Sequence, residues 1–375
     1  MSWRMKLGRN WGRLGMKFKL KDVCTRLSSG KGISSKFIGD SGKFPVYGGN
    51  GLRGYTEKSN FIGECAIIGR QGAFCGNVRY FFGEAYMTEH AVVVCANENH
   101  DTRYLSYLLA SMQLGRLSGQ SAQPGLSIKV LAEQEVDMPP LAQQKKITSI
   151  LASIENKIEL NNKINKNLSA LLQAIYQEQF DDVHLITNQG ILSDICSYSK
   201  EKVAVSELNV NTYFSTENML SGKAGSTKAA TLPTMPQTTA CRKGDTLISN
   251  IRPYFKKIVY CEDMCGCSTD VLCFTPVQFQ YAAYLFSTLY TDKFFAFMVA
   301  GSKGTKMPRG DKQQIMTYPV VLPTENELEE FNAIAFPVLE QLNSNKVENK
   351  RLSALRDALL PKLMSGELDV SDIDL

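Results

Sequence analysis

The chain has 375 residues, of which 43% are hydrophobic and 21% are charged, and its formal net charge is +5. This length is enough for two or three domains that each bury a core of their own, and the composition is that of a soluble globular protein. Gly, Pro or charge interrupts every apolar run before it could cross a bilayer, and the ten Cys are not spaced as a disulfide framework. We therefore expect a cytoplasmic protein with reduced thiols.

The positive charge is unevenly distributed along the chain. Residues 1–140 carry 18 Lys and Arg against 11 Asp and Glu, whereas residues 325–375 carry 5 against 11. A negatively charged partner is compatible with this pattern, but a solvated basic face is the commoner cause of so small an excess. Charge alone therefore does not identify a partner.

Residues 1–17, MSWRMKLGRNWGRLGMK, are a basic lead-in to a first predicted domain at 18–138. Short β-rich runs alternate with turn residues in this domain, and a helical stretch follows the last run. Its predicted elements are strands at 65–68 and 91–95, a helix at 104–114 and a polar Gly-rich loop, GQSAQPGLS, at 119–127. We expect a mixed domain of helices and strands.

A long helix is predicted at 139–180, because apolar residues recur there with a heptad period. Two heptad positions in the middle of this helix carry Asn instead of an apolar residue. An ordinary amphipathic helix lying on its own domain gives a similar pattern, so the period alone does not require a coiled coil. The heptad positions hold Ile147, Leu151, Ile154, Ile158, Asn161, Asn165, Leu168, Leu172 and Ile175.

The order of features repeats in the second half of the chain. LKDVC at 20–24 matches LSDIC at 192–196, and NKNLSALLQAIY at 165–176 matches NKRLSALRDALL at 349–360. A second domain of the same kind is therefore predicted at 181–323. Its elements are strands at 246–248 and 271–274, a helix at 281–298 and the loop GSKGTKMPRG at 301–310.

A second long helix is predicted at 324–361, followed by an acidic tail at 362–375. Thr324 and Glu327 form a capping box at its start, and Pro361 should prevent the helix from continuing past Leu360. Pro337 should kink this helix or separate a short first segment. The heptad positions hold Phe331, Ala335, Val338, Leu342, Asn345, Asn349, Leu352, Arg356 and Leu359.

Antiparallel pairing of the two helices would place Asn161 and Asn165 opposite Asn345 and Asn349. A buried amide without a partner costs about 1–3 kcal/mol, so these four residues would set the helix register. The predicted fold is α/β (α+β), with two similar mixed globular domains separated by two long antiparallel helices in a coiled coil. An approximate internal two-fold axis would relate the halves, and such a molecule suits two half-sites at a fixed separation on DNA.

Three stretches resemble the DNA-specificity (S) subunit of type I restriction-modification systems. PPLAQQKKITSILASIENKIELNNKINKNLSALLQAIY at 139–176 resembles its central region, and RLSALRDALLPKLMSGELDV at 351–370 resembles its C-terminal region. FPVYGGNGLRGYTEKSNFIGECAIIGRQGAFCGNV at 44–78 is similar to the first half of one class of its target recognition domains. The resemblance covers nearly the whole chain after residue 17. This sequence departs from the commoner pattern of the family at Pro337 and Arg356.

This resemblance implies two target recognition domains that each read one half of a bipartite sequence in double-stranded DNA. It also implies that the helices dock two methyltransferase subunits, which motor and nuclease restriction subunits then join. The chain itself is expected to be no enzyme and to hold no cofactor. Adenine methylation by S-adenosylmethionine and cleavage driven by ATP with Mg²⁺ would belong to the partner subunits.

No motif in the sequence supports catalysis by this chain. GRQGAFCG at 69–76 fits neither the dinucleotide fingerprint nor a P-loop, and the three His follow no triad or metal pattern. Two other functions stay open: a coiled-coil adaptor with duplicated protein-binding domains, and a stand-alone modification enzyme. The Cys residues that come nearest to a metal site lack the paired CxxC spacing, so we expect no metal; they are Cys241, Cys261, Cys265, Cys267 and Cys273.

Arg, Asn and Gln side chains read base edges through paired hydrogen bonds, and Lys and Arg bind phosphates. Polar loops with such residues are therefore the predicted DNA contacts in each domain. In the first domain they carry Tyr47, Asn50, Arg53, Tyr55, Arg70, Gln71, Asn77, Gln120 and Gln123. In the second they carry Lys223, Lys228, Asn250, Arg252, Tyr254, Lys256, Lys303, Lys306, Arg309 and Lys312.

Overall fold

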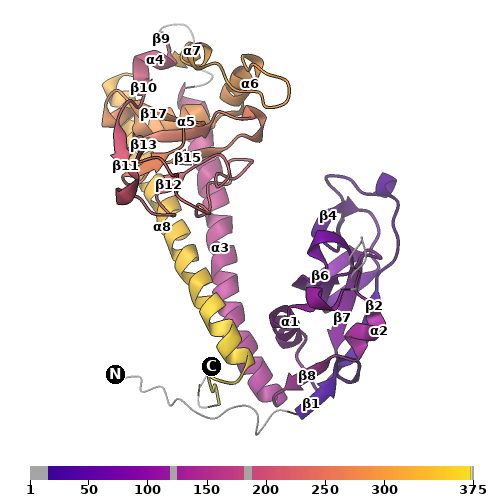
Figure 1. Ribbon diagram of the computed structural model, residues 1–375. Helices are drawn as coiled ribbons and strands as arrows, with labels where there is room; N and C mark the ends of the chain where they lie inside the picture. The colour runs from indigo at the N-terminus through magenta and orange to yellow at the C-terminus, as the bar shows by residue number, and fades with distance from the viewer. Residues whose placement is uncertain (1–15, 119–124, 181–187, 372, 374–375) are drawn as a thin grey trace. The chain divides into compact units, whose positions relative to one another are not determined.

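The computed structural model describes residues 16–118, 125–180, 188–371 and 373 (Figure 1). The chain forms two compact units: unit 1 comprises residues 1–159 and 349–375, and unit 2 comprises residues 160–348. Two helices of 40 residues, α3 (Leu141–Phe180) and α8 (Glu325–Met364), contribute one part to each unit. The units therefore cut across the linear segments that the sequence suggests. Among the described residues, no helix contains an apolar stretch long enough to cross a membrane.

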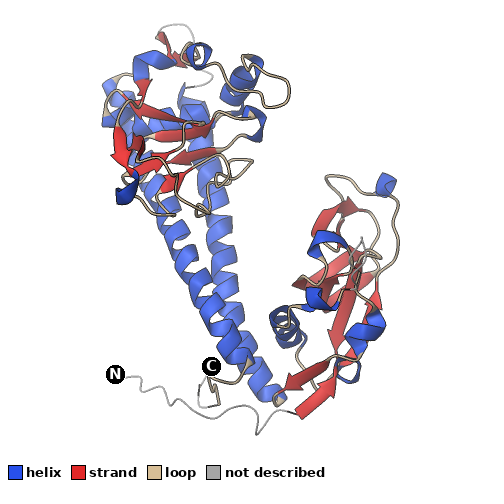
Figure 2. Cartoon of the chain, viewed as in Figure 1, coloured by secondary structure: helices blue, strands red, loops and turns tan. Residues whose placement is uncertain are grey.

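Unit 1 is built on one six-stranded sheet in the order β2-β7-β5-β6-β3-β4, in which only β3 and β6 pair in parallel (Figure 2). Helix α1 packs against β5 and β6, and β1 and β8 form a separate two-stranded sheet. The strands are β1 (Met16–Lys19), β2 (Cys24–Ser29), β3 (Phe44–Gly48), β4 (Gly51–Thr56), β5 (Phe61–Gly69), β6 (Val78–Met87), β7 (Ala91–Ala96) and β8 (Glu135–Met138). The helices are η2 (Leu20–Val23), η3 (Ser35–Phe37), η4 (Gly72–Phe74), α1 (Thr102–Ser111), η5 (Leu114–Leu117) and α2 (Ile128–Ala132).

Unit 2 contains two four-stranded sheets, in the orders β10-β17-β14-β15 and β11-β13-β16-β12, and the pair β9-β18. The strands are β9 (Gln189–Ile191), β10 (Cys196–Tyr198), β11 (Lys202–Ala204), β12 (Tyr213–Phe214), β13 (Gln237–Cys241), β14 (Thr246–Ser249), β15 (Ile258–Tyr260), β16 (Cys265–Cys267), β17 (Val271–Pro276) and β18 (Pro319–Val321). The helices are α4 (Leu192–Ile195), η6 (Val205–Glu207), η7 (Pro253–Phe255), η8 (Phe279–Tyr281), α5 (Ala282–Tyr290), α6 (Asp292–Ala300) and α7 (Lys312–Ile315).

The predicted duplication is confirmed by the topology of the two units. The order β2-β7-β5-β6 in unit 1 corresponds strand for strand to β10-β17-β14-β15 in unit 2. Strand β1 pairs antiparallel with β8 just before α3, as β9 pairs with β18 just before α8. The matched motifs also fold alike, because LKDVC and LSDIC each form one helical turn, η2 or α4, whose next residue begins a strand. The mixed α and β fold follows from the sequence pattern.

The core of unit 1 forms where the apolar run in β7 meets the helices. Val92 and Val94 pack in one buried cluster with residues of α1, while Val93 lies in a second cluster on the opposite face of the sheet. This alternation is the period of a strand that is buried on both faces. Ile147 and Leu151 of α3 complete the first cluster together with Leu363 and Val370, and Leu363 lies in the last turn of α8. The heptad positions at this end of α3 are therefore covered by the domain and by α8 alike.

The core of unit 2 is dominated by aromatic rings from three helices. Tyr176 and Phe180 of α3, Tyr284 of α5 and Phe331 of α8 are all buried. The ring centroids of Phe180 and Tyr284 lie 4.9 Å apart, and those of Phe180 and Phe331 lie 5.4 Å apart, both edge to face. Such pairs add stability beyond the burial of their area. The long helices therefore belong to the core of unit 2 and are not merely attached to it.

Two of the four Asn residues predicted to face each other, Asn165 and Asn345, meet within unit 2. Asn345 Nδ2 donates to Asn165 Oδ1 at 2.8 Å, and Gln341 Nε2 donates to Asn345 Oδ1 at 2.8 Å. Asn161 Nδ2 donates to Glu348 Oε2 at 2.7 Å. These contacts pair α3 and α8 antiparallel. Their role in fixing the register stays a prediction.

The prediction that Pro361 ends the second long helix is wrong, and Pro337 does not separate a short first segment. Helix α8 is a single helix through Pro337, and it continues through Pro361 to Met364. A helical Pro removes one hydrogen bond at a cost of about 3 kcal/mol. Around Pro337, the buried side chains of Ala335, Val338 and Leu339 offset that cost, and around Pro361 the buried Leu363 does so.

The predicted capping box is present, since Thr324 N donates to Glu327 Oε2 at 2.7 Å.

The single helix predicted at 281–298 is also divided. It consists of α5 and α6, which are separated at Thr291. The Thr291 hydroxyl accepts a hydrogen bond from Phe294 N at 3.1 Å, and its backbone is extended. Thr is a good N-cap because its side chain satisfies a free amide of the first turn. A new helix therefore begins at Asp292.

Candidate nucleic-acid interface

In unit 1, the turn between β3 and β4 lies against the end of β5. A Cβ atom on Gly49 would lie 3.1 Å from the carbonyl oxygen of His90 and 3.6 Å from the backbone nitrogen of Arg70, so glycine permits this close approach. Asn50 and Arg53 are exposed on this turn and on β4. The turn and the end of β5 thus bring together three predicted DNA contacts, Asn50, Arg53 and Arg70.

The aromatic residues of the same turn are less available. Tyr47 is half-buried and packs on Phe81 with ring centroids 5.0 Å apart, and burial raises the pKa of Tyr47. Tyr55 is also half-buried, and its backbone pairs with Gly39. Both tyrosines therefore pack within unit 1, and neither ring is fully exposed for stacking on a base.

The next loop, 70–77, joins the first turn to the late Gly-rich loop. Arg70 Nη1 donates to Ser29 Oγ at 3.3 Å, and Leu126 N donates to the Arg70 carbonyl oxygen at 2.9 Å. Gln71 forms a β-bridge with Gly125, and both Gln71 and Asn77 are exposed. The predicted residues Gln120 and Gln123 lie outside the described residues.

Two further arginines lie in this part of unit 1 that the sequence pattern does not single out. Arg79 and Arg116, together with Asn77 and Gln113, line a surface pocket of about 700 Å³. The guanidinium carbon of Arg79 lies 3.0 Å from where a Cβ atom on Gly51 would be, so Arg79 reaches the β3–β4 turn. Arg79 pairs with Ile67 near the end of β5 against which the turn lies, so the pairing of strands in the sheet brings it to the turn.

In unit 2, three predicted loops meet through backbone hydrogen bonds. Gly222 N donates to the Phe255 carbonyl oxygen at 2.8 Å, which joins loop 220–228 to loop 250–257. Arg252 N donates to the Pro308 carbonyl oxygen at 2.8 Å, which joins loop 250–257 to loop 301–310. These three loops therefore lie next to one another in unit 2.

Exposed basic and aromatic side chains are present on all three loops. Lys228, Tyr254 and Lys306 are exposed, and Lys312 is exposed at the start of α7. Lys303 and Arg309 are exposed too, but each makes an ion pair, with Asp311 at 2.6 Å and with Asp270 at 2.9 Å. The side chain of Arg252 is half-buried, and its Nη2 donates to the Lys306 carbonyl oxygen at 3.5 Å.

Asn250 does not lie on the surface as predicted. Its exposed fraction is 7%, and a Cβ atom on Gly310 would lie 2.9 Å from its Oδ1. Lys223 is half-buried as well, because its ammonium group lies 4.7 Å from the centroid of the Tyr290 ring. Loop 301–310 lies against Asn250, and residues of α5 and α6 lie against Lys223. Loop composition does not predict either contact.

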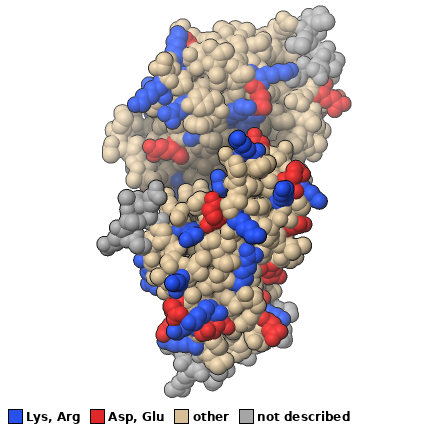
Figure 3. All heavy atoms as spheres, turned by 90° about the vertical axis from the view of Figure 1, so that its right-hand side faces the viewer, with Lys and Arg blue, Asp and Glu red and all other residues tan. Residues whose placement is uncertain are grey.

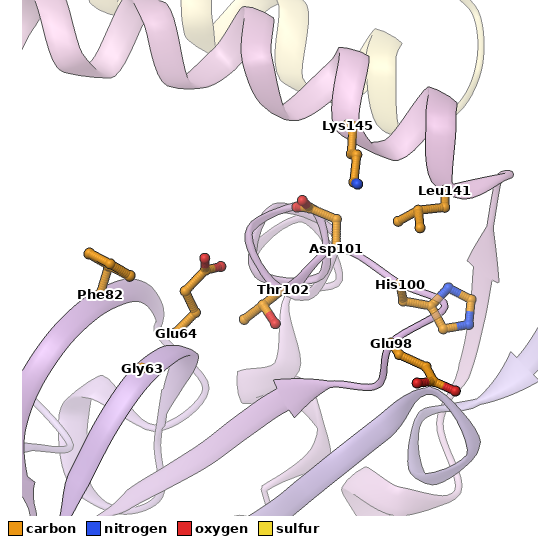
Figure 4. Close-up of a pocket in the computed structure, with 9 residues that line it drawn as sticks. All are labelled: Gly63, Glu64, Phe82, Glu98, His100, Asp101, Thr102, Leu141 and Lys145. Carbon is orange, nitrogen blue, oxygen red and sulfur yellow. The ribbon is translucent and has the colours of Figure 1, made fainter.

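A pocket of about 480 Å³ in unit 1 has the opposite charge to a DNA site. Glu64, Glu98 and Asp101 lie around it with His100 and Lys145 (Figure 4). Burial lowers the pKa of His100, which disfavours its cationic form. Three carboxylates beside one lysine repel phosphate, so this pocket does not belong to the candidate interface.

The Cys-rich region forms part of a hydrophobic core in unit 2. Cys265 Sγ donates to Cys261 Sγ at 3.5 Å, and Cys273 Sγ donates to Asp245 Oδ2 at 3.2 Å. Burial raises the pKa of Asp245, which favours a neutral partner for the thiol. No group of three or more His, Cys, Asp or Glu in the described part of the chain is arranged to hold a metal ion.

Charged side chains are mixed on the face of the molecule seen in Figure 3. Lys and Arg lie there among Asp and Glu and do not form one field of a single sign. The charge on this face alone therefore does not mark a DNA-binding surface.

Comparisons with known proteins find similarity to specificity proteins of type I restriction systems. Residues 15–170 match the family described as type I restriction modification DNA specificity domain. The specificity subunit of the type I restriction enzyme EcoprrI of Escherichia coli is 39% identical over 123 residues, which cover 33% of this chain and 30% of that protein. The specificity subunit of the type I restriction enzyme MjaIX of Methanocaldococcus jannaschii is 21% identical and covers 88% of this chain and 84% of that protein.

A solved structure shares the fold. The S subunit of a type I restriction-modification system from M. genitalium superposes with a TM-score of 0.64 at 18% identity, covering 97% of this chain and 98% of that chain. The matches to the first curated relatives are shorter, because this chain spans 30% of the Escherichia coli protein and 42% and 54% of two specificity subunits of Mycoplasma pneumoniae. The fold likeness therefore extends over the chain, whereas the stronger sequence likeness is local.

Proposed function

Since residues 15–170 belong to the family of type I restriction modification DNA specificity domains, we propose that the whole chain is the DNA-specificity subunit of a type I restriction-modification complex. The observation that carries the proposal is the duplicated topology of units 1 and 2. Two similar units, each with exposed polar loops, suit a bipartite site in double-stranded DNA of which each unit reads one half.

Each unit offers the two kinds of contact that sequence-specific binding needs. In unit 1, Arg53, Asn50 and Gln71 can form paired hydrogen bonds with base edges, and Arg79 can reach a phosphate. In unit 2, Lys306 and Lys228 are exposed cations, and Tyr254 is an exposed aromatic residue on the loop that joins theirs. Phosphate contacts position the protein on the duplex, and the amide and guanidinium groups select the bases.

The chemistry would belong to partner subunits. Methyl transfer to adenine from S-adenosylmethionine requires a methyltransferase, and cleavage driven by ATP and Mg²⁺ requires motor and nuclease subunits. The chain would act in the cytoplasm as the non-catalytic part that selects the DNA and docks two methyltransferase subunits.

Helix α3 offers a docking surface for such a subunit. Leu160, Ile164 and Leu171 are exposed by 51%, 36% and 49%, and their spacing places them on one face of the helix. Exposed apolar side chains in a row mark an interaction site.

Replacing Leu160 and Leu171 by Glu should abolish co-purification with the methyltransferase subunit without weakening DNA binding. Gln177→Glu, an exposed position on another face of α3, is the matched control, and an equal loss in this variant would contradict the assignment.

The salt dependence of DNA binding tests the proposed function. A protein with 6–10 phosphate contacts loses about 10³ to 10⁵ in affinity between 50 and 200 mM salt, and we expect the full chain to lose at least about 10³. Lys306→Ala should weaken binding to all sequences and reduce the salt slope by about one. The measurement is fluorescence anisotropy of a labelled duplex across a salt series.

A matched lysine provides the control for this experiment. Lys243 is exposed and precedes β14, whereas loop 250–257 follows β14, so the two lie at opposite ends of one strand. Lys243→Ala should leave the salt slope unchanged. Weak binding without a salt dependence would instead favour a coiled-coil adaptor whose two domains bind protein.

A further inference from the structure

Two lysines of unit 2 adopt a backbone conformation that side chains rarely accept. Lys223 in loop 220–228 has a φ of 62°, and Lys256 in loop 250–257 has a φ of 51°. The left-handed region suits glycine, and a lysine stays there only when contacts around it over-determine the conformation. The question is which contacts hold these two residues.

The backbones of the two loops are paired at this point. Lys223 N donates to the Lys256 carbonyl oxygen at 2.9 Å, next to the bond from Gly222 N to the Phe255 carbonyl oxygen at 2.8 Å. Both bonds require the left-handed turn to be maintained in each loop. These two bonds involve only backbone atoms, so they do not explain why lysine and not glycine occupies these two positions.

The two ammonium groups converge on a single carboxylate oxygen. Lys223 Nζ lies 2.7 Å from Asp292 Oδ1, and Lys256 Nζ lies 2.9 Å from the same atom. The Lys223 ammonium also lies 4.7 Å from the centroid of the Tyr290 ring and 5.9 Å from that of Phe295. Its side chain is only 16% exposed, so the charge has a carboxylate and two aromatic faces in place of most of its water.

Asp292 is fixed independently of the loops. It is the first residue of α6, which begins at the N-cap Thr291, and the N-terminus of a helix favours a negative charge. Hydrogen bonds from Lys223 and then Lys256 lower the pKa of Asp292, so the carboxylate is ionised at neutral pH. A rigid helix thus presents one acceptor to two loops.

We propose that Asp292 is a positioning residue for DNA recognition by unit 2, which holds loops 220–228 and 250–257 in the conformation that reads one half-site. This inference rests on the proposed function. The two lysines share Oδ1 of Asp292, so in this proposal Asp292 acts through the loops that carry them and not through a base contact of its own. It acts by fixing the loop that carries Arg252 and Tyr254.

The proposal predicts a loss of sequence selectivity that removal of a simple surface charge would not cause. Removing an exposed carboxylate from a basic surface raises the affinity for every DNA sequence, because repulsion from the phosphates is removed. If Asp292 positions the loops, Asp292→Asn should still raise non-specific affinity but should lose the sequence preference of one half-site. Loss of selectivity with gain of general affinity is therefore the expected result.

The experiment is selection from a pool of random-sequence duplexes by the purified full chain, followed by sequencing. The wild-type chain should enrich a bipartite motif, and Asp292→Asn should enrich the half read by unit 1 while losing the other half. The retained half serves as an internal control for folding. Glu201→Gln is the matched control, since it removes an exposed carboxylate that pairs with Arg242 at 2.6 Å in the same unit, and its motif should stay complete.

Two further variants separate positioning from other roles. Asp292→Glu, which keeps the charge, should recover part of the lost half-site. Lys256→Gly added to Asp292→Asn should also recover part of it, because glycine adopts the left-handed conformation without support. No recovery in either variant would overturn the proposal.

Hydrogen exchange gives a readout that needs no DNA. The amides of Gly222 and Lys223 should exchange about tenfold faster or more in Asp292→Asn, because their loops open when the charged hydrogen bonds are lost. A wild-type chain that enriches no motif would refute the proposed function, whatever the exchange rates. A wild-type bipartite motif that is unchanged in Asp292→Asn, or unchanged exchange, would refute this inference alone.

Discussion

Replacing Phe331 by Ala is expected to lower the free energy of unfolding by about 3–5 kcal/mol, the usual cost of removing a buried aromatic ring. Phe331 of α8 is fully buried, and its ring centroid lies 5.4 Å from that of Phe180 and 6.4 Å from that of Tyr176. Both partners belong to α3, so the cavity would open where the two long helices meet the domain. The surrounding side chains can fill this cavity only in part, because three packed helices surround it.

The measurement is denaturant unfolding of the full chain, followed by circular dichroism. Phe336→Ala is the matched control, because Phe336 lies five residues further along α8, is half-buried and stacks on the exposed Phe279 at 5.3 Å. It should cost about 1 kcal/mol, as a partly exposed residue does. Equal costs at the two positions would show that the aromatic cluster does not anchor α8 in unit 2.

The same cluster explains what the heptad pattern could and could not predict. Phe331, Leu342 and Leu172 were predicted as core positions, and all three are buried, because a helical period reports which face is covered. The pattern does not report what covers it. Leu172 and Phe331 pack with domain residues as well as with the other helix, so helix and domain share one core and cannot be separated along the sequence.

The prolines show how packing overrides a local rule. Pro361 was expected to end α8 at Leu360, yet the helix continues to Met364. Leu363 is buried in the core of unit 1, and burying a leucine contributes about 1.5–3 kcal/mol, which is close to the cost of the proline. Residues far away in the sequence form that core, so no local signal predicts the outcome.

The candidate interface was predicted as loops but not residue by residue. Glycine-rich stretches locate turns because glycine permits positive φ, as at Gly51 and Gly304. Positive φ at Arg252 and Lys256 has no such signal, since tertiary contacts impose it. The burial of Asn250 has the same cause, because it depends on how loop 301–310 packs against loop 250–257.

Inserting seven residues into each long helix is expected to lengthen the gap between the two half-sites and leave their sequences intact. The sequence predicts that α3 and α8 keep the two domains at a fixed separation. Seven helical residues add about 10.5 Å, which corresponds to about three base pairs at ~3.4 Å each. Suitable positions follow Glu159 in α3 and Glu348 in α8, where the chain passes between the units.

A heptad insertion keeps the pairing of the helices because it preserves the apolar stripe, whereas an insertion of four residues rotates it. The hydrogen bond between Asn165 and Asn345 lies wholly within unit 2 and would be retained. Both units keep their cores, so each half-site should be unchanged in the motif enriched from random duplexes. Insertion into α3 alone is the control, since it shifts the part of α3 before Leu160 against the part of α8 after Glu348, both of which belong to unit 1, and should weaken binding at every gap length. An unchanged gap with both helices lengthened would mean that the helices do not set the separation.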